Sequence, residues 1–134
     1  MSHHEKPAEH PNVALCRRLA DAFNSGDVTG MSDSFSDDIE WHEIGNPEPI
    51  RGKAALAERW QGMANAGGSY SVVEHATVGD DDHVVSLVEA TVTRGDRSLT
   101  YRTAEIYHVA DGKVTARWAF SDDTARINEF FGGM

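Results

Sequence analysis

Apolar residues recur at spacings of three and four in two stretches of the first half of the chain. In VALCRRLADAF one face is apolar and consists of Val13, Cys16, Leu19, Ala20 and Phe23. Asn12 is a suitable cap before this stretch, and Gly26 ends it. In KAALAERWQGMANA the apolar positions that share a face are Leu56, Trp60 and Met63. Each stretch therefore predicts an amphipathic helix.

The segment between these helices is shorter and more mixed. Val28, Met31 and Phe35 lie on roughly one stripe, which predicts a short second helix before an acidic pair at residues 37 and 38. Ile39 to Ile44 then predicts the first strand. Glycine, asparagine and proline in residues 45–49 predict a loop that leads into the third helix.

After Gly68 the pattern changes to strict alternation with a period of two. Four segments follow it, namely SYSVVEHATVG, HVVSLVEATVTRG, SLTYRTAEIYHVADG and KVTARWAFSDD. The turn sequences GDDD, RGDR and ADGK separate them and are short enough for hairpins, so the segments predict an antiparallel meander. Residues 122–131 predict a closing helical turn. Helices followed by a curved sheet predict an α+β fold in which the sheet wraps the third helix.

The segment EWHEIGNP, residues 40–47, combines charged side chains with a tryptophan. Strand side chains alternate between two faces, so Trp41 and Glu43 are expected to point one way and His42 the other. A carboxylate carried inward beside an indole is costly unless it is paired, protonated or used. Glu43 is therefore a candidate acid or base, and a structural carboxylate paired with an arginine is the alternative.

The charge balance limits the partners of this protein. The formal net charge of −10 repels phosphate backbones and anionic membrane surfaces, so we expect neither nucleic acid nor a membrane as a partner. Cys16 is the single cysteine, which excludes an intrachain disulfide. No apolar run approaches about 18 residues and no signal-peptide core precedes the first helix, which favours a cytoplasmic protein.

A length of 134 residues predicts one domain. The polar residues 1–11 are expected to form a flexible tail, and residues 12–134 a single domain. The tail histidines His3, His4 and His10 lack a fixed geometry, and His42 has no second histidine at a ligand-like spacing. We therefore predict no metal site.

Several short motifs occur in a fixed order along the chain. They are a Gly-Asp turn at residues 26–27, an acidic pair at 37–38, the sequence IRGK at 50–53 and the turn DGK at 111–113. This ordered set resembles the SnoaL-like branch of the nuclear transport factor 2-like superfamily over almost the whole chain. The resemblance implies a cone-shaped α+β barrel, with N-terminal helices on the concave face of a mostly antiparallel sheet and a pocket at the open end.

Ketosteroid isomerase, a member of that superfamily, uses a carboxylate base and an oxyanion hole made of a tyrosine and a protonated carboxylic acid. Its pattern, laid on this chain, puts the base at Glu43 and the acid at Glu105. The tyrosine of the oxyanion hole falls on Leu19, and two further pocket tyrosines fall on Phe35 and Trp60. At the matched positions this chain therefore has both carboxylates but lacks the tyrosine of the oxyanion hole. Trp41, Tyr101, Thr103 and Ala119 complete the candidate ligand-binding residues.

Other relatives fit less well or less specifically. Limonene epoxide hydrolase needs an aspartate, an arginine and a second aspartate, but the late-strand aspartate position is Ala119 here, and Glu89 has no arginine two residues before it. SnoaL-type polyketide cyclases depend mainly on one acid/base residue in an apolar cone, which this chain could supply. Arg117 shares a strand face with Ala119 and is a candidate to neutralise one of the glutamates, with an ordinary surface arginine as the alternative.

The leading hypothesis is a SnoaL-like pocket protein that works as an acid/base isomerase or cyclase, without a cofactor, on an apolar carbonyl compound such as a steroid, terpenoid or polyketide. Glu43 would remove a proton next to the carbonyl, and a protonated Glu105 would donate a hydrogen bond to the enolate oxygen. The alternative is a non-catalytic pocket that binds or sequesters a hydrophobic ligand. Trp118 and Phe120 are expected on the outer sheet face, which predicts a homodimer through that face.

Overall fold

The structure is a computed structural model that describes residues 9–132. The greater part of the expected tail, with His3 and His4, lies outside the described residues. The elements are, in chain order, α1 (Pro11–Ser25), α2 (Val28–Asp33), β1 (Phe35–Trp41), β2 (Ile50–Arg51), α3 (Lys53–Asn65), β3 (Gly68–Gly79), β4 (His83–Arg94), β5 (Arg97–Ala110), β6 (Lys113–Ser121) and α4 (Thr124–Gly132).

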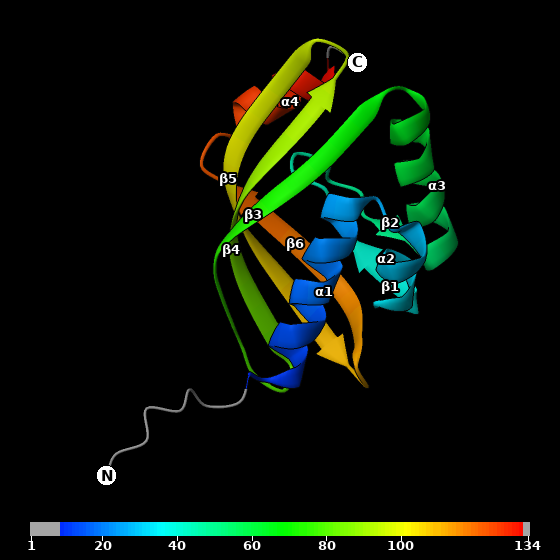
Figure 1. Cartoon of the computed structure of the whole chain (residues 1–134), viewed down its shortest axis with the longest axis vertical. Coiled ribbons are helices and arrows are strands. Elements are labelled where there is room, and N and C mark those ends of the chain that lie inside the picture. Colours follow the sequence, from blue (N-terminus) through cyan, green and yellow to red (C-terminus); the bar gives the residue numbers. More distant parts are fainter. Residues whose placement is uncertain (1–8, 133–134) are drawn as a thin grey trace.

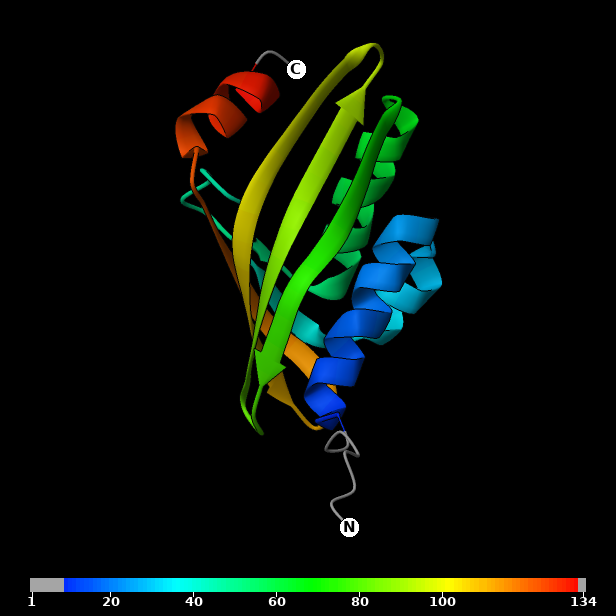
Figure 2. The same ribbon diagram turned by 60° about the vertical axis from the view of Figure 1, so that its left-hand side comes forward.

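One curved sheet of six strands forms the body of the protein, in the order β2-β1-β6-β5-β4-β3. The four long strands form the expected antiparallel meander, and β1 lies parallel to β6. Figures 1 and 2 show α1, α2 and α3 along one side of the sheet, with α4 beside one end of β5. The α+β prediction is confirmed. No helix among residues 9–132 has the length and apolar character needed to cross a membrane.

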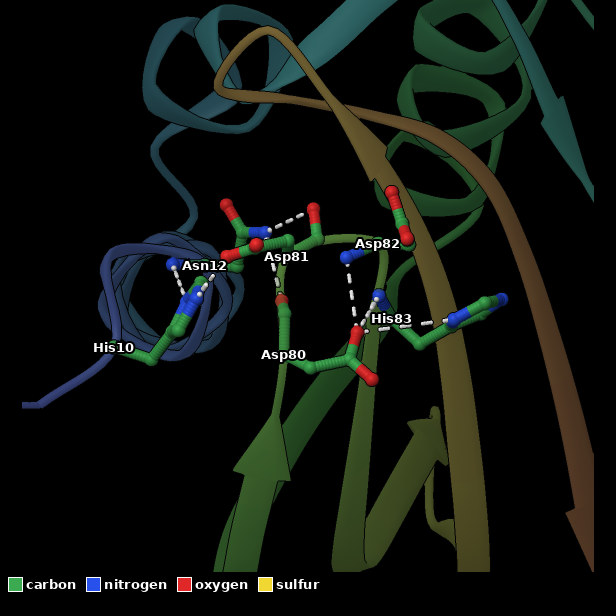
Figure 3. Close-up of polar contacts among 6 residues, drawn as sticks. All are labelled: His10, Asn12, Asp80, Asp81, Asp82 and His83. Carbon is green, nitrogen blue, oxygen red and sulfur yellow. Dashed lines mark hydrogen bonds and ion pairs between the residues drawn. The ribbon is translucent and has the colours of Figure 1, made fainter.

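The start of α1 is tied to the turn between β3 and β4, as Figure 3 shows. The expectation that Asn12 caps this helix is wrong, because Pro11 occupies the first helical position and His10 is the cap. The Nδ1 atom of His10 accepts from the backbone N–H of Asn12 at 3.1 Å, and its Nε2 atom lies 2.9 Å from Asp81. The Asn12 side chain instead donates to the carbonyls of Asp80 and Asp81, both at 3.0 Å.

The first strand differs from its expected bounds. It begins at Phe35 and ends at Trp41, four residues before the expected start and three before the expected end. Phe35 was assigned to a helical stripe, but it pairs with Val114 of β6 and opens the strand. After Trp41 the chain turns away from the sheet, and the two-residue strand β2 returns alongside β1. The sequence pattern does not predict β2, since two residues are too short to show a period.

The core lies between α1 and the concave face of the sheet. Leu15, Cys16 and Leu19 of α1 are buried there. The rings of Phe23, Phe35, Trp41 and Trp60 pack edge to face or tilted in the same cluster. The sheet wraps α3 less than expected. Leu56 of α3 is buried, but Ala55 and Gly62 remain exposed. The first helix therefore supplies the core, and α3 forms one wall of a more open region.

Candidate functional site

The loop after β1 is held at its first residue by β6. The backbone N–H of His42 donates to the carbonyl of Arg117 at 2.8 Å, and the Arg117 side chain donates through Nη1 to the carbonyl of His42 at 2.9 Å. The loop then folds back, since the N–H of Asn46 donates to the carbonyl of Glu43 at 3.2 Å. Gly45, at a φ of 80°, passes close to the side chain of Asn128 on α4. Glu43 thus directly follows a residue, His42, whose backbone N–H and carbonyl are both hydrogen-bonded to Arg117.

A cavity of about 340 Å³ lies between this loop, α3, α4 and the concave face of the sheet. This volume is near the lower end of the range found for small-molecule sites. The lining residues are Trp41, Glu43, Ile44, Gly45, Asn46, Arg59, Tyr70, Tyr101, Arg117, Ile127, Asn128 and Phe131. The cavity wall is therefore slightly more polar than apolar, with aromatic and aliphatic side chains among several converging polar groups.

A buried ion pair lies on the sheet side of the cavity, where its arginine lines the wall and its glutamate lies behind it. Arg117 is 6% exposed and Glu105 is 4% exposed, and Nη2 of Arg117 lies 2.6 Å from Oε2 of Glu105. The hydroxyls of Tyr107 and Tyr70 donate to the same carboxylate at 2.7 and 3.5 Å. The Trp41 ring covers the guanidinium, with its centroid 4.3 Å from Cζ. Burial alone would lower the pKa of Arg117, but the charge of Glu105 raises it above the ordinary value.

Two phenols of the cavity keep their protons at neutral pH. Burial raises the pKa of Tyr101 to about 12, and the charges of Glu105 and Glu43 add to this while Arg117 opposes it. Burial also raises the pKa of Tyr70 well above its ordinary value. Among residues 9–132, the Tyr101 hydroxyl has no hydrogen-bond partner, so its proton is available to a ligand.

Glu43 lines the cavity and also has an arginine partner, so its position is compatible with either of the roles that the sequence left open. It lines the cavity, as an inward carboxylate beside Trp41 should. Its Oε2 atom also pairs with Nε of Arg59 at 3.2 Å, with Glu43 24% exposed and Arg59 47% exposed. Because both side chains reach solvent, this ion pair contributes little to stability. His42 points to the other face, where its ring stacks on Trp118 at 4.8 Å.

The other predicted ligand residues divide into two groups. Tyr101 and Trp41 line the cavity. Leu19 and Phe35 are core residues at 0% and 2% exposure and do not line it, and Trp60 packs against the same core. Thr103 is buried on β5 with its hydroxyl unpaired, and Ala119 is the neighbour of Glu105 on β6. Neither of these two lines the cavity.

The role expected for Glu105 does not fit its geometry. A protonated acid would have to donate a hydrogen bond into the cavity, but both carboxylate oxygens accept, from a guanidinium and two hydroxyls. Glu105 is also absent from the lining, since Tyr70 and Arg117 stand between it and the cavity. Glu43 and Glu105 therefore do not face each other across one cavity. The neutralising role considered for Arg117 is confirmed, with Glu105 as the partner.

Several lining residues had no signal in the sequence. Ile127, Asn128 and Phe131 belong to α4, which the pattern predicted only as a closing turn. Arg59 lies on α3 beside Glu58, and a charged residue on a helix is usually an ordinary solvent-exposed side chain. Tyr70 follows the parity of β3, but parity does not reveal that its hydroxyl reaches a carboxylate on β5.

The three tyrosines of the chain give a test of this interior. Tyr70, Tyr101 and Tyr107 all have a pKa raised above the ordinary value of 10.0, in each case chiefly by burial. A group that holds its proton more tightly in the folded state leaves stability unchanged below the unfolded pKa and lowers it as the pH rises above that value. We therefore expect tyrosinate absorbance to appear only together with unfolding, above about pH 10. Tyrosinate formation with an unchanged circular dichroism spectrum would contradict the buried arrangement.

Comparisons with known proteins agree with this architecture. An uncharacterized protein of Mycobacterium tuberculosis is 27% identical over 132 residues, which cover 90% of this chain and 95% of that protein. The structure of Bal32a, from a soil-derived mobile gene cassette, superposes with a TM-score of 0.80 at 24% identity, covering 90% of this chain and 95% of that one. An M. tuberculosis LEH-like epoxide hydrolase superposes with a TM-score of 0.78 at 18% identity, covering 95% and 91%.

Structural neighbours with the cystatin-like and NTF2-like folds include proteins from Xanthomonas campestris and Burkholderia pseudomallei. They confirm the fold that the sequence resemblance implied. The family model of the SnoaL-like domain matches residues 16–117, which is more than half of the chain. The chain therefore belongs to the SnoaL-like domain family.

Proposed function

We propose that this protein catalyses proton transfer at a carbon next to a carbonyl group, as an isomerase or cyclase of an apolar carbonyl compound. The observation that carries the proposal is that Glu43 and the unpaired, proton-bearing hydroxyl of Tyr101 line the same cavity. One group can accept a proton and the other can donate a hydrogen bond to an oxygen that becomes negative. Tyr101 thereby takes the place of the phenol that is lost at Leu19.

The reaction begins with the transfer of a proton from the α-carbon to the carboxylate of Glu43. The electron pair of the broken C–H bond forms a carbon–carbon double bond, and the carbonyl electrons move to the oxygen. The resulting enolate oxygen accepts a hydrogen bond from Tyr101. Return of the proton from Glu43 to the γ-carbon of a conjugated dienolate gives an isomer. Attack of the enolate carbon on a second carbonyl carbon of the same molecule forms a ring, and the alkoxide formed there takes the proton back from Glu43. Both outcomes leave Glu43 ready for another turnover.

The remaining polar groups support this assignment. Arg59 of α3 pairs with Glu43, so a cation lies beside the carboxylate that would accept the proton. The buried pair of Arg117 and Glu105 is neutral as a unit, so the sheet-side wall suits a neutral carbonyl compound more than an anion. An epoxide hydrolase is disfavoured, because Ala119 takes the late-strand position where the resemblance would need an aspartate and Glu89 has no arginine two residues before it.

Deuterium exchange tests the proposal directly. The probes are cyclic monoketones, which are neutral and exchange their α-protons slowly by themselves, in deuterated buffer. Binding is checked by ligand-observed NMR and exchange by loss of the α-proton signal. We expect the protein to accelerate exchange for at least one ligand that binds. Binding of several members without any acceleration would overturn the proposal in favour of a carrier that sequesters a hydrophobic molecule.

We also propose a homodimer through the outer sheet face. Phe120 is 60% exposed there and Leu87 42%, while Trp118 is half-buried against His42 and His108. Exposed apolar patches of this kind on a soluble domain are typical of interfaces.

Sedimentation velocity at micromolar concentration should therefore show twice the chain mass of 14.7 kDa. Phe120→Lys should shift the protein to the monomer, whereas Val28→Lys, at an exposed apolar position on α2, should leave the dimer unchanged. A wild-type monomer at this concentration would rule out the interface.

A further inference from the structure

A second and larger cavity adjoins the first one. It has a volume of about 630 Å³ and lies between α3, the ends of β3 and β4, and α4. Arg59 and Phe131 line both cavities, so these two side chains form the boundary that the two spaces share, and Arg59 carries the ion pair with Glu43 there. A molecule bound beside Glu43 could therefore extend past these two side chains into the second cavity.

The walls of the second cavity are mainly apolar. Ile50 and Val92 form the sheet side, and Met63 faces them from α3. Ala55 and Gly62, both exposed, give α3 a shallow surface where larger side chains would otherwise fill the space. The charged residues Glu58, Arg59 and Arg94 lie among this lining, so a polar boundary accompanies the apolar wall. Such a lining fits a flexible hydrocarbon chain.

We infer that the second cavity receives a linear alkyl or isoprenoid tail of the same ligand whose carbonyl head lies beside Glu43. This inference rests on the head site of the proposed function, but not on the proton transfer itself. It narrows the substrate class to a carbonyl compound with an apolar tail. The two cavities divide the ligand, since the phenols and carboxylate meet the head while Val92, Met63 and Phe131 meet the tail.

Gly62 provides a variant that fills the tail cavity without disturbing the fold. A Cβ atom added there meets no heavy atom within 4 Å. Leucine also has a higher helix propensity than glycine, so Gly62→Leu is expected to fold. Ala64→Leu is the matched control, because Ala64 is exposed on the same helix and lines neither cavity.

The experiment measures dissociation constants by calorimetry for 2-alkylcyclohexanones with methyl, butyl and octyl substituents. For the wild type, affinity should rise about fourfold for each methylene that enters the cavity. Gly62→Leu should weaken octyl binding about tenfold and leave methyl binding unchanged, while Ala64→Leu should match the wild type. Absence of binding, affinity that does not rise from methyl to octyl, or equal loss for both substituents in Gly62→Leu would overturn the inference.

Proton exchange is recorded separately for the same ketones. If affinity rises with the length of the alkyl chain but no exchange occurs, the proposed proton transfer is contradicted and the tail cavity is supported. If exchange occurs but affinity does not rise with the length of the alkyl chain, the proposed proton transfer is supported and the tail cavity is rejected. The two conclusions therefore fail independently.

Discussion

Replacing Arg117 by methionine is expected to lower the free energy of unfolding by about 3–5 kcal/mol. The substitution leaves the carboxylate of Glu105, 4% exposed, without its counterion in the interior. It also removes the hydrogen bond to the carbonyl of His42 and the contact with the Trp41 ring. The measurement is urea unfolding followed by circular dichroism.

The control for this prediction is Arg102→Met. Arg102 is exposed on β5, so its removal should change the free energy of unfolding by less than about 0.5 kcal/mol. The double variant Arg117→Met with Glu105→Leu should recover part of the loss, because no unpaired charge then remains in the interior. If Arg117→Met costs no more than Arg102→Met, the pair does not hold the folded state together.

Replacing Glu43 by glutamine is expected to reduce deuterium exchange into a bound cyclic monoketone about a hundredfold to ten-thousandfold. Glutamine keeps the shape of the side chain but cannot accept the proton. The affinity for the ligand should stay within a few-fold, since the apolar walls are unchanged. Tyr101→Phe should reduce exchange about a hundredfold to a thousandfold, because it removes the hydrogen bond to the enolate oxygen.

Glu48→Gln is the matched control for Glu43. Glu48 belongs to the same loop region, is exposed and does not line the cavity, so its exchange rate should equal that of the wild type. Equal exchange in Glu43→Gln and the wild type would remove Glu43 from the mechanism. A loss of stability in Glu43→Gln without a specific loss of exchange would show that the carboxylate is structural.

The sequence predicted the architecture well where its period was strong. The alternation after Gly68 defined four strands whose bounds agree closely with β3 to β6. It was weaker where elements are short, as with β2, or where pairing with a distant strand decides the outcome, as with Phe35 at the start of β1. The local period of apolar residues carries no information about pairing with a strand far away in the sequence.

The same limit applies to the site. Strand parity placed Trp41 and Glu43 on one face and His42 on the other, and the structure agrees. Parity also predicted that Glu105 points inward. It did not predict how deeply Glu105 is buried or which residue it pairs with. Ala119 stands opposite Glu105, and Arg117 is its diagonal neighbour two residues away, so the ion pair depends on the register between β5 and β6. That register follows from the packing of the whole sheet.

The tie between His42 and Arg117 also sets when the site can form during folding. The two residues are 75 positions apart, so the contact closes most of the chain into a loop. Closing so long a loop carries an entropic cost that must be met before the contact stabilises anything. On the ribosome, Glu43 is synthesised early but reaches its position only after β6 has emerged and paired with β1. The carboxylate that we propose as the proton acceptor is therefore placed only after most of the chain has been synthesised, although its residue lies in the first third of the sequence.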